Sequence, residues 1–303
     1  MNKEICNAIE QIVSASNVLK DEPMSRHTTF RTGGPASLFI RPDNEEQLIE
    51  VMNLIRKLGI DYFILGNGSN LLVSDEGFDG IVISLGNLND IHIEGKRSIY
   101  AGAGAMNSQI AAFARDNSLK NFEFAAGIPG TIGGAMIMNA GAYGGEMKLV
   151  TKSVKVLSPT GEVMVLDNSS MEFGYRTSAI KGRGYIVISV VLLLEKGDKE
   201  TITQNIQDLA AKRREKQPLE FPSAGSTFKR PVGYYAGKLI EDAGLRGFSV
   251  GDASVSEKHC GFVINKGKAT SADVYELICE VKKKVYENSG VTLEPEVIML
   301  GKF

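Results

Sequence analysis

The stretch 43–59, DNEEQLIEVMNLIRKLG, has the clearest helical pattern in the chain. Its apolar side chains recur with the helical period of about 3.6 residues, at Leu48, Val51, Met52, Ile55 and Leu58. Asp43 and Glu46 have the spacing of a capping box, and Gly59 falls where helices commonly end. The pattern predicts a helix that ends before Gly59.

The rest of the apolar pattern mixes two periods. Helical spacing recurs at 107–117, in a stretch that ends near 218, at 234–245 and at 271–290. Short apolar runs predict strands at 61–65, 81–85, 98–105, 153–167, 184–195 and 261–265. Three domains are expected from this order: 1–86, 87–218 and 219–290, with 291–303 returning to the first. A linker bracketed by Pro218 and Pro222 opens the third.

Charge and cysteine content narrow the function classes. The chain has 303 residues, of which 34 are basic and 36 acidic, so no bulk field draws it to nucleic acid or to an anionic membrane. Three widely spaced cysteines lack the Cys/His spacings of a zinc site, and no metal is expected. Without a visible secretory signal, these features predict a reduced, cytoplasmic protein with no structural disulfide.

Between Phe124 and Gly145 there is no charged residue, and seven of these 22 residues are Gly. Glycine costs a helix about 1 kcal/mol relative to alanine, so a long helix is not expected here. Small residues instead allow close approach of the main chain to a bulky group. The segment GIPGTIGG at 127–134 and the loop LGNGSN at 65–70 could each turn backbone N–H groups toward a phosphate. The alternative is that both are tight turns without a ligand.

The common nucleotide and hydrolase fingerprints are absent. A dinucleotide G-x-G-x-x-G fails at Leu71 and at Asn107, and neither a Walker A loop nor a G-x-S-x-G elbow occurs. The histidines His27, His92 and His259 have no metal-like spacing. For the first two, an ordinary surface or satisfied role is expected, whereas His259 lies beside Lys258 and could face a substrate.

Six segments together resemble the family of UDP-N-acetylenolpyruvoylglucosamine reductases. They are RHTTFRTGGPA, LGNGSNLLVSDEGFDG, EFAAGIPGTIGGAMIMNAGAYGGE, FGYRTS, PSAGSTFKRP and LEPEVIMLG, which span nearly the whole chain in the family's order. The resemblance implies an α+β protein in which two subdomains form an FAD-binding fold of the vanillyl-alcohol-oxidase type, followed by a smaller α/β substrate-binding domain. It also implies non-covalent FAD, NADPH as hydride donor and a monomer that reduces UDP-N-acetylglucosamine enolpyruvate in peptidoglycan synthesis.

The resemblance also assigns site residues. Those expected to line FAD are Gly66, Asn67, Gly68, Ser69, Asn70, Gly127, Pro129, Gly130, Gly133, Gly134 and Asn139. Those expected at the substrate are Tyr175, Lys229, Arg230, Lys238 and His259, together with Lys258. For each basic residue alone, an ordinary surface position is an equal alternative.

Three further residues match the family's catalytic positions. Arg176 would hold the substrate carboxylate, because its planar fork pairs two oxygens. Glu296 would present a proton or hydrogen bond to the same carboxylate, and Ser226 would protonate the neighbouring carbon. Spacing alone does not exclude Glu294 or Thr227 for these last two roles.

The chain departs from some relatives in one segment. Only TSAIKGRG separates Arg176 from the next predicted strand, so the chain resembles the shorter subtype that lacks a tyrosine lid. Two other functions are considered: an oxidase of the same flavin superfamily with a different substrate, and a nucleotide-sugar binding module without catalysis. Neither accounts for the joint Arg176, Ser226 and Glu296 pattern.

Overall fold

The computed structural model describes residues 3–303 as two compact units. Unit 1 comprises residues up to Leu19, then Phe39–Asn67 and Val82–Arg213. Unit 2 comprises Lys20–Leu38, Gly68–Ile81 and Arg214–Phe303. The three-domain division expected from the sequence stays a prediction. No helix in the described part of the chain is long and apolar enough to cross a membrane.

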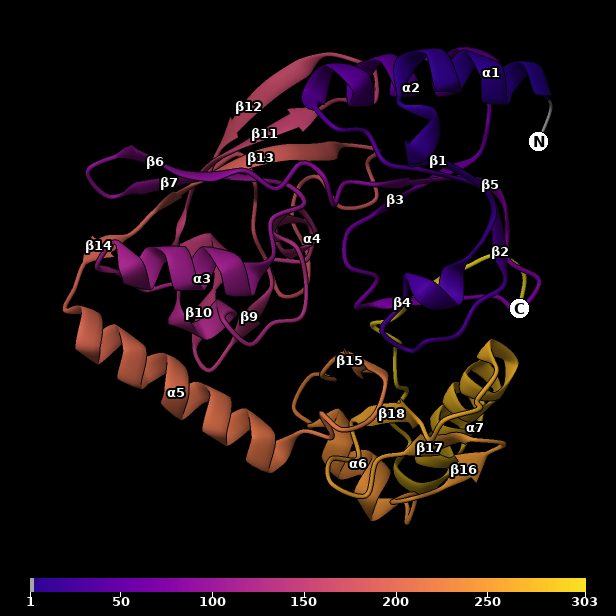
Figure 1. Ribbon diagram of the computed structural model, residues 1–303. Coiled ribbons are helices and arrows are strands. Elements are labelled where there is room, and N and C mark those ends of the chain that lie inside the picture. The colour runs from indigo at the N-terminus through magenta and orange to yellow at the C-terminus, as the bar shows by residue number, and fades with distance from the viewer. Residues whose placement is uncertain (1–2) are drawn as a thin grey trace. The chain divides into compact units, whose positions relative to one another are not determined.

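One four-stranded sheet has the order β1-β2-β5-β3. Its strands are β1 (Val18–Pro23), β2 (Pro35–Ile40), β3 (Tyr62–Leu65) and β5 (Phe78–Ser84). The division between the units passes through β1, β2 and β5, so each of these strands contributes residues to both units. In unit 1, helices α1 (Lys3–Ile12) and α2 (Glu45–Leu58) lie side by side (Figure 1).

Helix α2 confirms the clearest sequence prediction but corrects its cap. Gly59 ends the helix in the left-handed conformation, with φ of 63°. The predicted capping box of Asp43 and Glu46 is wrong, since Asn44 is the N-cap and accepts from the backbone N–H of Gln47. The Asp43 carboxylate is instead used by the side-chain amides of two asparagines, Asn17 and Asn87.

Unit 1 also holds an antiparallel five-stranded sheet of order β12-β11-β13-β7-β6. The strands are β6 (Ile91–Gly95), β7 (Ser98–Gly102), β11 (Thr151–Leu157), β12 (Val163–Asp167) and β13 (Ile186–Leu193). Strands β11 and β12 form the hairpin that the Ser-Pro-Thr-Gly segment predicts. Helix α3 (Asn107–Asp116) lies beneath this sheet in the view of Figure 1.

The uncharged run contains a short helix that the sequence argument did not expect. Helix α4 spans only Ile132–Ile137 and packs against β13 and β7. A Cβ on Gly133 would lie 3.0 Å from both the Cβ and the carbonyl oxygen of Ala103, so glycine allows the helix to approach β7 closely. The glycines that weaken the helix are therefore also what lets it pack.

Short strands and one long helix complete unit 1. The strands are β8 (Leu119–Lys120), β9 (Gly141–Ala142), β10 (Gly145–Glu146) and β14 (Glu195–Lys196), which pair as β14 with β8 and β10 with β9. Helix α5 (Lys199–Lys216) follows β14, and Ile202 is its one buried residue. The division between the units falls near its end, after Arg213.

Unit 2 contains an antiparallel sheet of order β15-β18-β17-β16. Its strands are β15 (Ser223–Ser226), β16 (Ser249–Val250), β17 (Ala253–Val255) and β18 (Phe262–Asn265). Helix α6 (Ala236–Asp242) precedes the sheet's central strands, and α7 (Ser271–Ser289) packs against β16, β17 and β18 (Figure 1). Near the C-terminus, β19 (Ile298–Leu300) returns to pair in parallel with β4 (Leu71–Val73).

The N-terminus of α7 is held by a residue from far along the chain. Thr270 and Asp273 form a capping box, and both oxygens of Asp75 accept further backbone hydrogen bonds at 2.8 Å, from Ser271 and Ala272. A carboxylate at this position satisfies N–H groups that have no partner inside the helix and complements the helix dipole. Residues 68–81 are thereby joined to the C-terminal part of unit 2.

Candidate active site

The first glycine loop contacts the second through Gly66 and Asn67, which belong to unit 1 together with residues 127–134. The side-chain amide of Asn67 donates a 3.0 Å hydrogen bond to the carbonyl oxygen of Pro129. A Cβ on Gly66 would lie 2.5 Å from the Thr131 hydroxyl, so the first loop can only approach the second where it has glycine. The structure therefore brings together two loops that are 62 residues apart along the chain.

The first loop also has the backbone of an anion site. Gly68 adopts φ of +59°, and a Cβ there would lie 1.9 Å from the carbonyl oxygen of His27. Within residues 3–303, the backbone N–H groups of Asn67, Gly68, Ser69 and Asn70 donate to no protein acceptor. Successive unpaired N–H groups around a left-handed residue are suited to a phosphate. That this loop binds the diphosphate of FAD stays a prediction.

The glycines of the second loop differ in their surroundings: one faces open space and two pack against protein groups. Gly134 is exposed, and a Cβ there would meet only the Thr131 hydroxyl, at 3.8 Å, so this face is open. Gly133 is required by packing on Ala103, and a Cβ on Gly127 would meet the Arg213 side chain at 2.9 Å. Protein packing thus accounts for part of the glycine content that the sequence argument assigned to a ligand.

Arg176 lies in a tight loop between β12 and β13 of unit 1. It adopts φ of 55°, a left-handed conformation that costs a residue with a side chain roughly 1–2 kcal/mol. Its guanidinium lies 5.4 Å from the centre of the exposed Tyr175 ring. Such conformations persist where the surroundings determine them, and they are frequent at active sites.

Several hydrogen bonds hold this loop. Gly174 and Thr177 exchange backbone bonds of 3.0 and 3.3 Å across its neck. The Lys181 ammonium donates to the carbonyl oxygen of Arg176 at 2.8 Å, and the Ser178 hydroxyl donates to the carbonyl oxygen of Ile137 at 2.9 Å. The loop is thereby fastened at Arg176 and on its C-terminal side.

Asn139, predicted to line the cofactor, contacts protein groups in the structure. It is 2% exposed, and its side chain donates to Glu146 at 3.0 Å and to the carbonyl oxygen of Gly174 at 3.1 Å. Its own oxygen accepts from the backbone N–H of Lys148 at 2.9 Å. Asn139 therefore fastens the Arg176 loop on its N-terminal side.

In unit 2 the residues that follow Ser226 pair with the segment that contains Glu296. The backbone N–H of Glu296 donates a 2.8 Å hydrogen bond to the carbonyl oxygen of Thr227, and Phe228 forms an antiparallel bridge with Pro295. Asn70 donates its side-chain amide to the carbonyl oxygen of Glu296 at 3.1 Å. The serine segment and the glutamate segment therefore lie side by side, with an end of the first glycine loop attached.

The structure places the two adjacent hydroxyl residues in different surroundings. Ser226 is exposed, whereas Thr227 is fully buried and its hydroxyl accepts from the backbone N–H of Val263 at 2.9 Å. Glu294 forms an ion pair with Lys229. Thr227 is thus a core residue, whereas the Ser226 side chain is at the surface, and the choice of Glu296 over Glu294 stays a prediction.

The remaining basic candidates of unit 2 each contact a different protein group. The Arg230 guanidinium stacks 3.9 Å from the centre of the Tyr235 ring. Lys238 pairs with Asp242 one turn further along α6, and this hydrogen bond raises the pKa of Lys238. Lys258 donates to the carbonyl oxygen of Arg214.

His259 is half-buried and lies within unit 2. Its Nδ1 accepts a 3.1 Å hydrogen bond from the backbone N–H of Gly261, and its ring packs edge-on against Phe262. Burial lowers the pKa of His259, and the charge of Arg246 acts in the same direction. The histidine is therefore neutral near pH 7 and accepts through Nδ1.

Arg213 is a residue that the sequence argument missed. It projects from α5 against Gly127, and burial lowers the pKa of its guanidinium while Tyr143 acts in the opposite direction. A half-buried arginine beside the second glycine loop is a candidate contact for an anionic ligand. Its position in the basic run AKRREK gives no signal that separates it from its neighbours.

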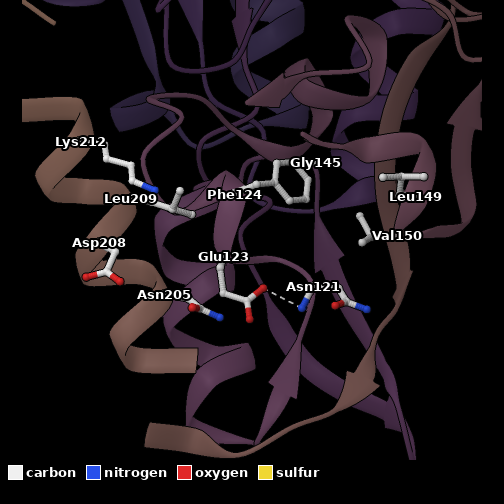
Figure 2. A pocket seen from close by; sticks show the side chains of 10 residues that line it. All are labelled: Asn121, Glu123, Phe124, Gly145, Leu149, Val150, Asn205, Asp208, Leu209 and Lys212. Carbon is white, nitrogen blue, oxygen red and sulfur yellow. Dashed lines mark hydrogen bonds between the residues drawn. The ribbon is translucent and has the colours of Figure 1, made fainter. Parts of the chain in front are cut away.

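Figure 2 shows a pocket of about 420 Å³ in unit 1, between α5 and residues at both ends of the uncharged run, among them Phe124 and Gly145. Apolar Phe124 and Leu209 line it together with Glu123, Asp208 and Lys212. None of the predicted site residues lines it, and no group of three or more metal-ligating side chains occurs in residues 3–303. The hollow is thus separate from the predicted chemistry.

Family models match two parts of the chain. A model described as FAD binding domain matches residues 36–167. A second, described as UDP-N-acetylenolpyruvoylglucosamine reductase, C-terminal domain, matches residues 217–300.

Similar proteins cover almost the whole chain. The UDP-N-acetylenolpyruvoylglucosamine reductase of Clostridioides difficile (strain 630) is 50% identical over 302 residues, 99% of each chain. That of Clostridium perfringens (strain SM101 / Type A) is 49% identical over 299 residues, 99% of this chain and 98% of its own.

Solved structures confirm the predicted α+β fold of the FAD-binding type. The crystal structure of UDP-N-acetylenolpyruvylglucosamine reductase from Thermus caldophilus superposes with a TM-score of 0.80 at 35% identity, covering 94% of this chain and 98% of that one. A structure of alkyldihydroxyacetonephosphate synthase gives a TM-score of 0.51 at 16% identity over 65% of this chain and 41% of its own. The second likeness concerns the fold alone.

Proposed function

Because the chain belongs to the UDP-N-acetylenolpyruvoylglucosamine reductase family and contains an FAD-binding domain, we propose that it reduces UDP-N-acetylglucosamine enolpyruvate to UDP-N-acetylmuramate with NADPH as electron donor. Family membership makes it an FAD-binding oxidoreductase of peptidoglycan synthesis. We further propose that it acts in the cytoplasm as a monomer, and its three free cysteines suit a reducing compartment.

Residues of the two glycine loops would hold the cofactor. The unpaired N–H groups of Asn67 to Asn70 are suited to its diphosphate, and the open face at Gly134 leaves room for a flat group. When bound, FAD supplies a carrier of hydride between NADPH and the vinyl group of the substrate. The other predicted cofactor residues of this segment, Gly130 among them, stay part of the proposal.

Arg176 would pair both oxygens of the substrate carboxylate. Negative charge develops beside this carboxylate when hydride reaches the terminal vinyl carbon, and a preorganised guanidinium stabilises it. Glu296 would donate a proton or hydrogen bond to the same group. The exposed Tyr175, beside Arg176, is proposed as a substrate contact.

Ser226 would deliver the proton that completes the reduction. Its hydroxyl is a weak acid, but the α-carbon of the enolate-like intermediate is basic enough to take its proton when the two are aligned. The exposed serine would then recover a proton from water. The diphosphate of the substrate would be held by Lys229, Arg230, Lys238 and His259, with the short TSAIKGRG segment in place of a lid.

One observation carries this assignment. The segment Thr227–Lys229 pairs with Glu294–Glu296, so the residue after Ser226, whose hydroxyl can give a proton, is hydrogen-bonded to the backbone of Glu296, whose carboxyl can bind a carboxylate. An oxidase of the same flavin superfamily has no need for this pairing. A binding module has no need for a proton donor.

The visible absorption spectrum of the purified protein tests the proposal. We expect a yellow protein that bleaches when NADPH is added without oxygen and recovers its colour only when the enolpyruvyl nucleotide sugar follows. Turnover of another alcohol without this recovery would support an oxidase instead. Stoichiometric binding of the nucleotide sugar with no NADPH consumption would support a binding module.

A further inference from the structure

We infer that Asn139 is a positioning residue that fixes the loop carrying Arg176, an inference that rests on the proposed role of Arg176. The side-chain amide of Asn139 donates two hydrogen bonds to protein groups, one to the Glu146 carboxylate and one to the carbonyl oxygen of Gly174. Gly174 is two residues before Arg176. An asparagine in the middle of the glycine-rich run therefore acts on the arginine loop.

The local backbone explains why an asparagine stands there. Asn139 adopts φ of 41°, which asparagine tolerates better than most residues with side chains. This conformation follows directly after helix α4, and the backbone N–H of the next residue, Ala140, bonds back to Ala135. The turn thus places a short amide side chain beside the loop.

The last residue of helix α4 and the turn that follows the helix bond to the arginine loop on both sides of Arg176. Ile137, the last residue of α4, accepts from the hydroxyl of Ser178, two residues after Arg176. Asn139 donates to Gly174 on the other side. Arg176 itself is in a strained left-handed conformation, and these two bonds attach its neighbours to the segment around α4, in addition to the bonds within the loop.

The same arrangement links the arginine to the cofactor segment. Helix α4 begins at Ile132, within GIPGTIGG, and ends where Asn139 takes hold of the loop. A displacement of about 1 Å at a reacting group can cost about 100-fold in rate. One short helix, α4, and the hydrogen bonds of Asn139 and Ser178 thus connect the loop that carries Arg176 to the GIPGTIGG segment.

The test uses the FAD-loaded full-length protein with Asn139→Ala. We expect recovery of flavin colour by the enolpyruvyl nucleotide sugar to slow about 100-fold. Bleaching by NADPH and the FAD content should stay within twofold of the unsubstituted protein, because Arg176 acts only on the substrate carboxylate. Affinity for the lactyl-ether product, measured by calorimetry, should fall as well.

Two further variants separate the hydrogen bonds of Asn139. Asn139→Asp keeps the acceptor for Lys148 but loses the donor to Gly174, so it should not rescue the rate. Glu146→Gln leaves the bond to Gly174 in place and should react normally. Asn168→Ala is the matched control, because Asn168 bonds to the carbonyl oxygens of Lys148 and Thr151 but not to the arginine loop.

A double variant shows whether Asn139 acts through Arg176. If it does, Asn139→Ala in an Arg176→Lys background adds little to the loss from Arg176→Lys alone, whereas independent roles would multiply. Hydrogen exchange of peptides covering 171–181 should accelerate in Asn139→Ala and not in Asn168→Ala.

The outcomes distinguish this inference from the proposed function. Normal colour recovery in Asn139→Ala, with a slow Arg176→Lys, would overturn the positioning role. Normal recovery in Arg176→Lys would instead overturn the proposed role of the arginine. If Asn139→Ala fails to retain FAD, Asn139→Asp, which also removes the bond to Gly174, replaces it with the same expected slowing, and normal recovery there would overturn the inference.

Discussion

The ammonium group of Lys181 donates a 2.8 Å hydrogen bond to the carbonyl oxygen of Arg176, five residues earlier in the chain. The lysine thus binds the main chain of a residue that has a strained left-handed φ. Lys181→Met should keep most of the apolar stem and lose this bond. We expect colour recovery with the enolpyruvyl substrate to slow roughly tenfold, about 1.4 kcal/mol in the barrier. Stopped-flow absorbance measures it, with the exposed Lys152→Met as the control.

Ser226→Ala should separate the two halves of the reaction. Bleaching of the flavin by NADPH should be unchanged, because no proton is delivered to carbon in that step. Recovery by the enolpyruvyl substrate should fall by about 100-fold or more, the usual contribution of a positioned proton donor. The rate of colour recovery in Thr227→Val, which removes the adjacent hydroxyl, serves as the comparison. If Ser226→Ala recovered its colour at the normal rate, the serine would have no part in protonation.

Gly68→Ala should lower the free energy of unfolding by more than the cost of its left-handed backbone conformation alone. The left-handed φ costs roughly 1–2 kcal/mol for a residue with a Cβ, and this Cβ would also lie 1.9 Å from the carbonyl oxygen of His27. Gly59→Ala is matched in φ, at +63°, but a Cβ there meets nothing within 4 Å. Urea unfolding should show the larger loss for Gly68→Ala, together with a lower FAD content. Equal losses would contradict the clash.

Asp75→Ala should weaken unit 2 through helix α7. The carboxylate accepts two backbone hydrogen bonds at the start of the helix, and a lost cap costs about 0.5–2 kcal/mol. Chemical denaturation followed by circular dichroism measures the free energy of unfolding. The control Asp79→Ala loses one exposed hydrogen bond to Ser37 and should be almost neutral. A loss in the control as large as in Asp75→Ala would argue against the capping role.

His259 predicts a pH dependence of stability. Burial lowers the pKa of His259 in the folded protein below its ordinary value of 6.5, so the unfolded chain binds more protons than the folded one as the pH falls through that value. Stability is therefore full above pH 6.5 and decreases below it. In His259→Gln this contribution is absent, so the decrease in unfolding free energy between pH 7.5 and pH 5.5 should be smaller. An identical decrease would show that other groups cause it.

The sequence predicted elements well where a local rule was sufficient. Helix α2 ends at Gly59 because a residue without a Cβ adopts the left-handed cap freely. The choice of Asn44 as N-cap over Asp43 was beyond local reasoning, because Asn17 and Asn87 from other segments engage the Asp43 carboxylate. Helix α4 was missed because its packing on β7 and β13 outweighs the cost of its glycines.

The sequence was a weaker guide to which of two neighbouring residues belongs to the site. Ser226 and Thr227 are adjacent hydroxyl residues, and a strand period of two says that they face opposite sides without saying which side is buried. Only the fold shows that Thr227 is inside and bonded to Val263. Likewise, the bond between Asn139 and Gly174 joins residues 35 positions apart, for which no spacing rule exists.

The interleaved composition of unit 2 has a consequence for how the chain is made. Phe30 and Leu72, both fully buried, belong to the same core cluster as Leu277 and Val281 of α7. A ribosome releases residues 20–38 and 68–81 long before the partners that bury them exist. Residues 217–300, expressed as a separate fragment, would lack those two segments and expose the surface they cover. The C-terminal domain that sequence comparison recognises therefore completes its core with residues from outside its own range.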